Sequence, residues 1–141
     1  SIIQSRMRIS MHRITIIDMR SPANDSINYR LQWLGSSLGL FGLRDKDRSA
    51  FRIFIELLKG AKHDRSYSSD ELAMMLCLTR GTVVHHLNKL MLAGIVINEN
   101  NRYLLRVDRL EKLVEEVRKD SMRIFDNLKD VAKDIDRQLG L

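Results

Sequence analysis

Two helix patterns, each with its own start signal, lie about three residues apart in the middle of this 141-residue chain. The first, SSDELAMMLCL, opens with Ser68 and Glu71 at the spacing of a capping box. The second, RGTVVHHLNKLML, follows Thr79, a good N-cap residue, and is ended by Gly94. Two helices joined by so short a turn must cross steeply, so this stretch predicts a helix-turn-helix.

The segments on either side complete a small domain over residues 45–107. Upstream, DKDRSAFRIFIELLKG predicts a helix that acidic residues open and that Lys59 and Gly60 close. Downstream, GIVINENNRYLLRV predicts two short strands around Glu99–Asn101, because Asn tolerates the left-handed backbone of a tight hairpin. Three helices followed by a hairpin make a winged helix. The expected fold class is therefore mainly α with a small β-hairpin wing.

Residues 108–141 predict one long helix with an apolar seam. The seam persists for about thirty residues, or about 45 Å, and only Ser121 interrupts it. A domain of this size cannot cover such a stripe alone, so we expect a second copy of the chain to cover it and assign the segment to homodimerisation. The seam residues are Leu110, Leu113, Val117, Ile124, Leu128, Val131 and Ile135.

Residues 1–44 form an N-terminal extension. The stretch HRITIID, residues 12–18, is β-branched and partly alternating, which predicts a short strand. After a polar linker, NYRLQWLGSSLGLFGL predicts a short helix that packs on the core or on a partner chain. We place Trp33 of this segment in the dimer interface.

Cysteine usage and hydropathy suggest the compartment. A single cysteine, Cys77, excludes an internal disulfide framework and suits a reducing environment. No apolar run approaches the roughly 20 residues that span a bilayer, and the first residues lack a secretory signal pattern. We expect a cytoplasmic protein with no membrane partner. Cys77 is expected to be a small buried residue, and Met74, Met75 and Met91 to be flexible core filler.

The charge of the chain is unevenly spread. Of the net +6, residues 1–107 carry 16 basic and 9 acidic side chains (+7), while residues 108–141 carry 8 and 9 (−1). Basic side chains that neutralise phosphates release condensed counterions, which supplies affinity without regard to sequence. The basic domain therefore favours a polyanionic partner, and double-stranded DNA is the partner we expect.

The pattern from FRIFIELLKG through SSDELAMMLCLTRGTVVHHLNKLMLAGIV to NRYLLRV resembles winged helix-turn-helix regulators of the ArsR-like type, including archaeal members. The resemblance covers about residues 45–107, and its most specific pieces are DELA, LTRGTVVHHLNKL and AGIV. MarR-like and other winged-helix regulators share much of this pattern. The resemblance implies a dimeric DNA-binding transcriptional regulator, usually a repressor.

Two departures from the family pattern matter. Metal-sensing relatives carry a pair of cysteines in the helix before the recognition helix, whereas this chain has Cys77 alone, where a Gly commonly closes that helix. Thiolate-based metal sensing is therefore not expected here. The wing tip NENN is short and includes Glu99, so Arg102 and Arg106 flank the tip as its cations.

His85 and His86 are the first candidates for a metal or catalytic centre. Consecutive helix residues point about 100° apart, so these two side chains cannot share one metal as an i, i+4 pair can. No second cysteine, nucleophile motif or glycine-rich phosphate loop accompanies them. We expect no metal, no cofactor and no enzymatic activity. His86 is expected to brace the helix half-buried, and His85 to face outward.

The outer face of the second helix follows from the angle of its buried residues. Arg80 suits guanine O6 and N7, Asn88 suits adenine, and Val84 suits a thymine methyl group. Gly81 leaves room for a close backbone approach, and Lys89 lies at the edge of this face. The predicted DNA contacts are Ser68, Ser69, Thr79, Arg80, Gly81, Thr82, Val84, His85, Asn88, Lys89 and Arg102.

Two functions remain open at this point. In one, a homodimer reads a pseudo-palindromic site whose half-site centres lie about 34 to 36 Å apart. In the other, the winged helix is a protein–protein or architectural module with only non-specific DNA binding. The effector, the operator and the sign of regulation are not determined by the sequence.

Overall fold

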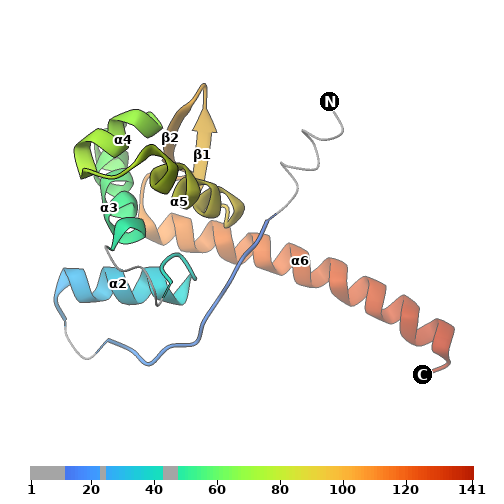
Figure 1. Ribbon diagram of the computed structural model, residues 1–141. Coiled ribbons are helices and arrows are strands. Elements are labelled where there is room, and N and C mark those ends of the chain that lie inside the picture. The colour runs from blue at the N-terminus through green and yellow to red at the C-terminus, as the bar shows by residue number, and fades with distance from the viewer. Residues whose placement is uncertain (1–11, 23–24, 43–47) are drawn as a thin grey trace.

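The computed structural model describes residues 12–22, 25–42 and 48–141 (Figure 1). Its elements are, in chain order, α2 (Ile27–Ser37), α3 (Ser49–Lys62), α4 (Ser69–Leu76), α5 (Arg80–Leu92), β1 (Val96–Glu99), β2 (Arg102–Leu105) and α6 (Leu110–Leu139). The protein is mainly helical with one antiparallel hairpin and a long C-terminal helix. This confirms the predicted winged helix-turn-helix.

Three helices enclose the core of the domain. The N-caps predicted for α4 and α5 are confirmed: the Ser68 hydroxyl accepts from the Glu71 N–H at 3.0 Å, and the Thr79 hydroxyl accepts from the Thr82 N–H at 3.2 Å. Each cap fixes where its helix begins, so the apolar faces of the two helices meet α3 in a defined register. The central core residues are Ile53, Phe54, Leu57, Leu72, Val83, Leu87, Leu90 and Ile95.

Helix α3 differs from the prediction at both ends. It begins at Ser49, and the acidic residues expected to open it, Asp45 and Asp47, lie outside the described residues. It continues through Gly60 to Lys62, so the prediction that Gly60 closes the helix is wrong. A Cβ at Gly60 would lie 2.7 Å from the Tyr67 ring and 2.8 Å from the Arg65 carbonyl oxygen. This glycine therefore permits close packing of the following loop.

The hairpin forms as predicted. Val96 pairs with Leu105 and Glu99 pairs with Arg102, and the two turn residues, Asn100 and Asn101, both have positive φ (54° and 63°). Asn is one of the few side chains that adopts this left-handed backbone readily. Tyr67, between α3 and α4, adds a bridge to Tyr103 on β2, with N–O distances of 3.0 and 2.6 Å. The wing is thus attached to the helical part through β2.

Residues 12–20 form an extended segment, the strap, and not the strand predicted at residues 12–18. Its backbone hydrogen bonds run to helix ends: the Arg13 N–H donates to the Leu92 carbonyl and the Ile17 N–H donates to the Ser37 carbonyl, both at 2.7 Å. The β-branched residues favour an extended backbone, but the strap meets helix termini and not a sheet edge. The short helix predicted next is confirmed as α2, and Leu40 after it enters the core.

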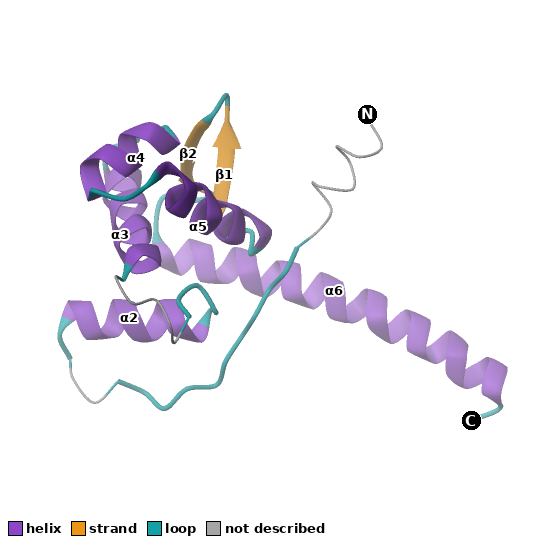
Figure 2. Cartoon of the chain, viewed as in Figure 1, coloured by secondary structure: helices purple, strands orange, loops and turns teal. Residues whose placement is uncertain are grey.

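Helix α6 is attached to the domain only through its first turns. Leu113 and Val117 are 1% and 3% exposed within the chain's own core, so their assignment to a dimer seam was wrong. Beyond them the helix projects away from the domain (Figures 1 and 2). Its exposed apolar residues there include Phe125, Leu128, Val131, Ile135 and Leu139. No helix of the described residues is long and apolar enough to cross a membrane.

Candidate nucleic-acid interface

The outer face of α5 is left uncovered by the rest of the domain. Val83, Leu87 and Leu90 turn inward and are at most 2% exposed. At Gly81 an added Cβ would meet nothing within 4 Å. The predicted stripe is therefore assembled on one solvent-facing surface, with Val84 and Thr82 half-buried at its margin. Its exposed members are Arg80, Gly81, His85, Asn88 and Lys89.

Part of the predicted phosphate-contacting set serves the fold itself. The Ser68 hydroxyl caps α4, and the Thr79 hydroxyl both caps α5 and donates to the Thr82 hydroxyl at 2.9 Å. Ser68 and Ser69 are half-buried. These groups lie at the starts of α4 and α5, where backbone N–H groups and the helix dipole attract anions.

Arg80 is well placed to leave its intramolecular partner. Its Nε lies 3.5 Å from Asp70 Oδ1, and both side chains are more than 70% exposed. An exposed pair of this kind contributes at most about 1 kcal/mol. The guanidinium can therefore turn from Asp70 to another acceptor at small cost.

Arg102 flanks the wing tip as predicted, but its guanidinium is engaged within the chain. Its guanidinium donates to both carboxylate oxygens of Glu71, at 3.0 and 3.2 Å, and to the Ser66 hydroxyl and carbonyl, at 3.0 and 2.8 Å. The hydrogen bond from Arg102 is the main reason that the pKa of Glu71 lies below its ordinary value. The Arg102 guanidinium thus donates four hydrogen bonds within the chain. Arg102 braces the wing against α4, and the structure gives no support to its prediction as a phosphate contact.

Comparison with known families bears on this arrangement. Residues 57–98, which run from within α3 through α4 and α5 into β1, match the family model described as "Bacterial regulatory protein, arsR family". This segment is similar to the helix-turn-helix part of that family. No curated protein and no solved structure matches the chain. The similarity points to a DNA-binding transcriptional regulator, and α4 and α5 are the two helices of the helix-turn-helix.

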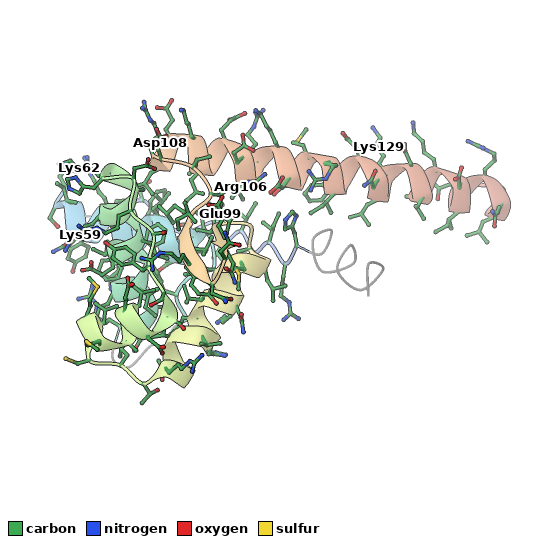
Figure 3. The ribbon with its side chains drawn as sticks, turned by 90° about the horizontal axis from the view of Figure 1, so that it is seen from above. Lys59, Lys62, Glu99, Arg106, Asp108 and Lys129 are labelled. Carbon is green, nitrogen blue, oxygen red and sulfur yellow. The ribbon has the colours of Figure 1, made fainter. Side chains whose placement is uncertain are left out.

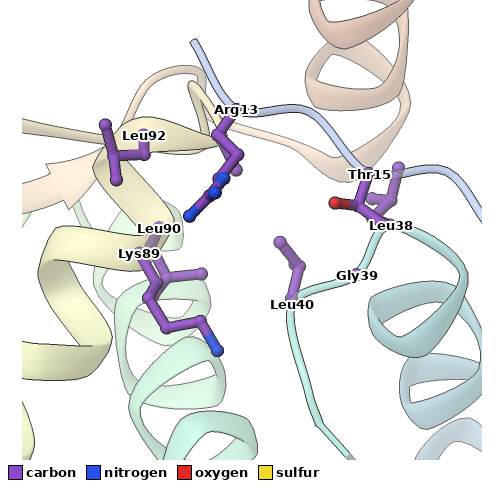
Figure 4. Close-up of a pocket in the computed structure, with 9 residues that line it drawn as sticks. Arg13, Thr15, Leu38, Gly39, Leu40, Lys89, Leu90 and Leu92 are labelled. Carbon is purple, nitrogen blue, oxygen red and sulfur yellow. The ribbon is translucent and has the colours of Figure 1, made fainter.

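Beside the helix-turn-helix, the strap adds a cation that sequence reasoning missed. Arg13 and Lys89 line a hollow of about 90 Å³ together with Thr15 and the turn at Leu38–Leu40 (Figure 4). Within the described part of the chain, no carboxylate forms a salt bridge with either cation. Nothing local in the sequence places Arg13 beside Lys89, because 75 residues separate them.

The two adjacent histidines of α5 lie as predicted. His85 is exposed and His86 is half-buried, with their rings tilted by 60° and their centroids 5.4 Å apart. In the described residues, no group of three or more His, Cys, Asp or Glu side chains is arranged to hold a metal ion. Their positions fit one histidine on the outer stripe and one packed against the helix flank.

The sulfur-containing residues at the end of α4 were predicted wrongly. Cys77 is exposed and has a φ of +55°, so it takes the left-handed position that a glycine commonly fills after a helix. Met74 is 82% and Met75 is 50% exposed, so neither fills the core. The helix is short and only Leu72 and Leu76 of it are buried, which leaves the intervening positions on its solvent side.

Proposed function

We propose that the chain is a sequence-specific, double-stranded DNA-binding transcriptional regulator that acts as a homodimer and represses by occupying its site. The observation that carries the proposal is the outer face of α5, in the segment similar to the arsR family. A cap at Thr79 fixes where this helix begins, and most of its outer face is exposed in the described structure. A helix with these properties fits the major groove of B-DNA.

The proposed contacts divide by chemistry. Arg80, near the start of α5, pairs with a guanine edge, Asn88 pairs with an adenine edge, and the half-buried Val84 meets a thymine methyl group. Exposed His85 lies between them on the same stripe. Lys89 contacts a phosphate, and Arg13 of the strap joins it there. Ser69, at the start of α4, and Thr82, in the first turn of α5, add phosphate contacts through their hydroxyls.

Dimerisation is assigned to the projecting part of α6. Leu128, Val131 and Ile135 are 59%, 57% and 50% exposed, at the spacing of one helical face. A second α6 covers this face and holds two recognition helices about 34 to 36 Å apart, one turn of DNA. Leu110 and Ile124, both half-buried, lie at the base of this face, and Trp33 on α2 remains a secondary candidate for the interface.

Selection of binding sites from random duplexes at fixed salt tests the proposal. We expect an enriched inverted repeat, bound at least a thousandfold more tightly than random duplex. Binding without any enriched repeat would instead support the protein–protein or architectural module, whose affinity for DNA is electrostatic only. Both alternatives give a steep salt dependence, so the ratio of specific to non-specific affinity decides between them.

A further inference from the structure

Asp120 on α6 is the one charged side chain that is buried in the described part of the chain, with 2% of its surface exposed. Its Oδ2 accepts from Arg106 Nη1 at 2.6 Å, and its Oδ1 accepts from Arg106 Nη2 at 3.4 Å and from Arg123 Nη1 at 3.2 Å. Both oxygens of the carboxylate are therefore satisfied. We call Arg106 and Asp120 the joint.

The joint holds the base of the wing against α6. Arg106 directly follows β2, and its backbone N–H donates to the Ile95 carbonyl at 2.9 Å. Its guanidinium also reaches Glu116, one helical turn before Asp120, at 3.2 Å. In Figure 3, Arg106 lies where the hairpin meets α6. One planar cation thus contacts two carboxylates on the same helix, which fixes direction as well as distance.

The exit of α5 and the strap meet the same joint. Gly94, just after α5, has a φ of +76°, and a Cβ there would lie 3.3 Å from Asp120 Oδ2 and 3.5 Å from Arg106 Nη1. On the other side, Arg123 Nη2 lies 3.5 Å from His12 Nδ1 of the strap. The end of the recognition helix, the wing, the strap and α6 therefore converge on one buried carboxylate.

Stability alone does not account for an ion pair at this place. The cost of desolvating two charges offsets most of their attraction, and apolar pairs of similar volume often stabilise a core as well or better. What a bidentate arginine–carboxylate pair adds is a defined relative orientation of the elements that carry it.

We propose that Arg106 and Asp120 form a rigid joint that fixes the angle between α6 and the DNA-reading unit, which consists of α3, α4, α5 and the β1–β2 hairpin. The joint thereby sets the distance between the two recognition helices of the dimer. This inference rests on the proposed homodimer. Asp120 is a positioning residue in it, because it acts through the exit of α5 and the base of the wing and touches no DNA.

The sole cysteine provides the test. Cys77 is exposed and lies three positions before Arg80, the first residue of α5. One nitroxide attached to Cys77 in each chain therefore reports the distance between the two DNA-reading units of the dimer. Pulsed electron paramagnetic resonance should give one narrow distance distribution for the otherwise unaltered protein. Asp120→Asn keeps the shape of the side chain and removes its charge. We expect the distribution to broaden at least twofold, while sedimentation still shows a dimer.

A matched variant and a weaker variant make the result decisive. Asp126→Asn, exposed on the same helix, should leave the distribution unchanged. If Asp120→Asn does not fold, Glu116→Gln weakens the second ion pair of the Arg106 guanidinium, on its partly exposed side. This variant should broaden the distance distribution by a smaller factor. A folded, dimeric variant with the original width and mean would overturn the joint. No dipolar signal between chains in the unaltered protein would overturn the homodimer itself, and this role with it.

Discussion

At the scale of single residues, backbone conformation decides places where side-chain type alone misleads. Cys77 has the composition of a core residue, yet its φ of +55° and its exposure show that the chain needs a left-handed residue there to end α4. Its N–H closes the helix through the carbonyl oxygens of Ala73 and Met74. This position requires a left-handed backbone conformation, and the exposed thiol does not pack into the core.

Replacing Cys77 with glycine should therefore stabilise the protein. In Cys77→Gly the cost of the left-handed conformation disappears, and no core contact is lost, so we expect the free energy of unfolding to rise by about 1 kcal/mol. Cys77→Val, which is β-branched, should lower it. Urea unfolding followed by circular dichroism measures both, and a Gly variant less stable than the original would show that the thiol has a contact worth more than the strain.

Arg80 and Lys89 should differ in what they contribute to binding. Arg80→Ala removes a base contact and should relax the preference at one position of the selected site, at a cost of about 1 to 3 kcal/mol there. Lys89→Ala should weaken all duplexes alike and reduce the slope of log affinity against log salt by about one. Fluorescence anisotropy at several salt concentrations, with the selected site and its single-base variants, separates the two effects.

An unchanged site preference in Arg80→Ala would place a different part of α5 in the groove. Glu56→Gln serves as the control for a change of charge on another helix, because Glu56 lies on α3 and pairs there with Lys59. It should leave both the site preference and the salt slope as they are.

At the scale of elements, the sequence predicted what local signals determine. The caps at Ser68 and Thr79 and the left-handed pair Asn100–Asn101 each act within four residues, and α4, α5 and the hairpin formed where these signals put them. The strap could not be predicted in this way. Its extended backbone is local, but its partners, the Leu92 and Ser37 carbonyls, are determined by how distant helices end.

The outer stripe of α5 was predictable for the same reason, since it follows from helical periodicity alone. The pairing of Arg102 with Glu71 and the meeting of Arg13 with Lys89 were not, because each joins residues more than 30 positions apart. Counting charges along the chain therefore overstated the cations on the wing: Arg102 and Arg106 are both held by carboxylates of the same chain.

Helix α6 gives the prediction that belongs to this scale. Leu128→Glu places a charge on the exposed apolar face and should raise the dimer dissociation constant at least tenfold, or about 1.4 kcal/mol. Lys129→Glu changes charge at the next position, which lies off the apolar face, and should have a much smaller effect (Figure 3). Sedimentation velocity at micromolar concentration measures both. Equal effects of the two substitutions would indicate that this face is not the interface.

At the scale of the whole molecule, we expect the attachment of α6 to the domain to depend on whether Asp120 is protonated. Burial raises the pKa of Asp120, but hydrogen bonds and charge from Arg106 and Arg123 outweigh it, so this pKa lies below its ordinary value. The hydrogen bond to Asp120 likewise raises the pKa of Arg106. A carboxyl group whose pKa is lowered by folding stabilises the folded state above its unfolded pKa, and this contribution disappears as the pH falls.

Acid should therefore loosen the molecule at the joint. We expect the unfolding free energy to decline as the pH falls below about 4, the ordinary pKa of an aspartic acid, and the decline to be shallower in Asp120→Asn. Asp126→Asn should keep the original slope, because that exposed side chain forms no salt bridge within the described residues. Thermal unfolding between pH 3 and 6 provides the measurement, and parallel curves for all three proteins would contradict the prediction.

The projecting part of α6 also links the amount of protein to its degree of order. Beyond Ile124 the helix has surface ion pairs such as Arg137 with Asp134, but no core to hold it. Isolated helical segments of this length are marginal in water, so an unpaired chain should fray there and expose a protease-sensitive tail. Association and ordering of this segment then become a single event. In the proposed homodimer, a chain that has not yet found a partner would lose this segment to proteolysis sooner than a paired chain.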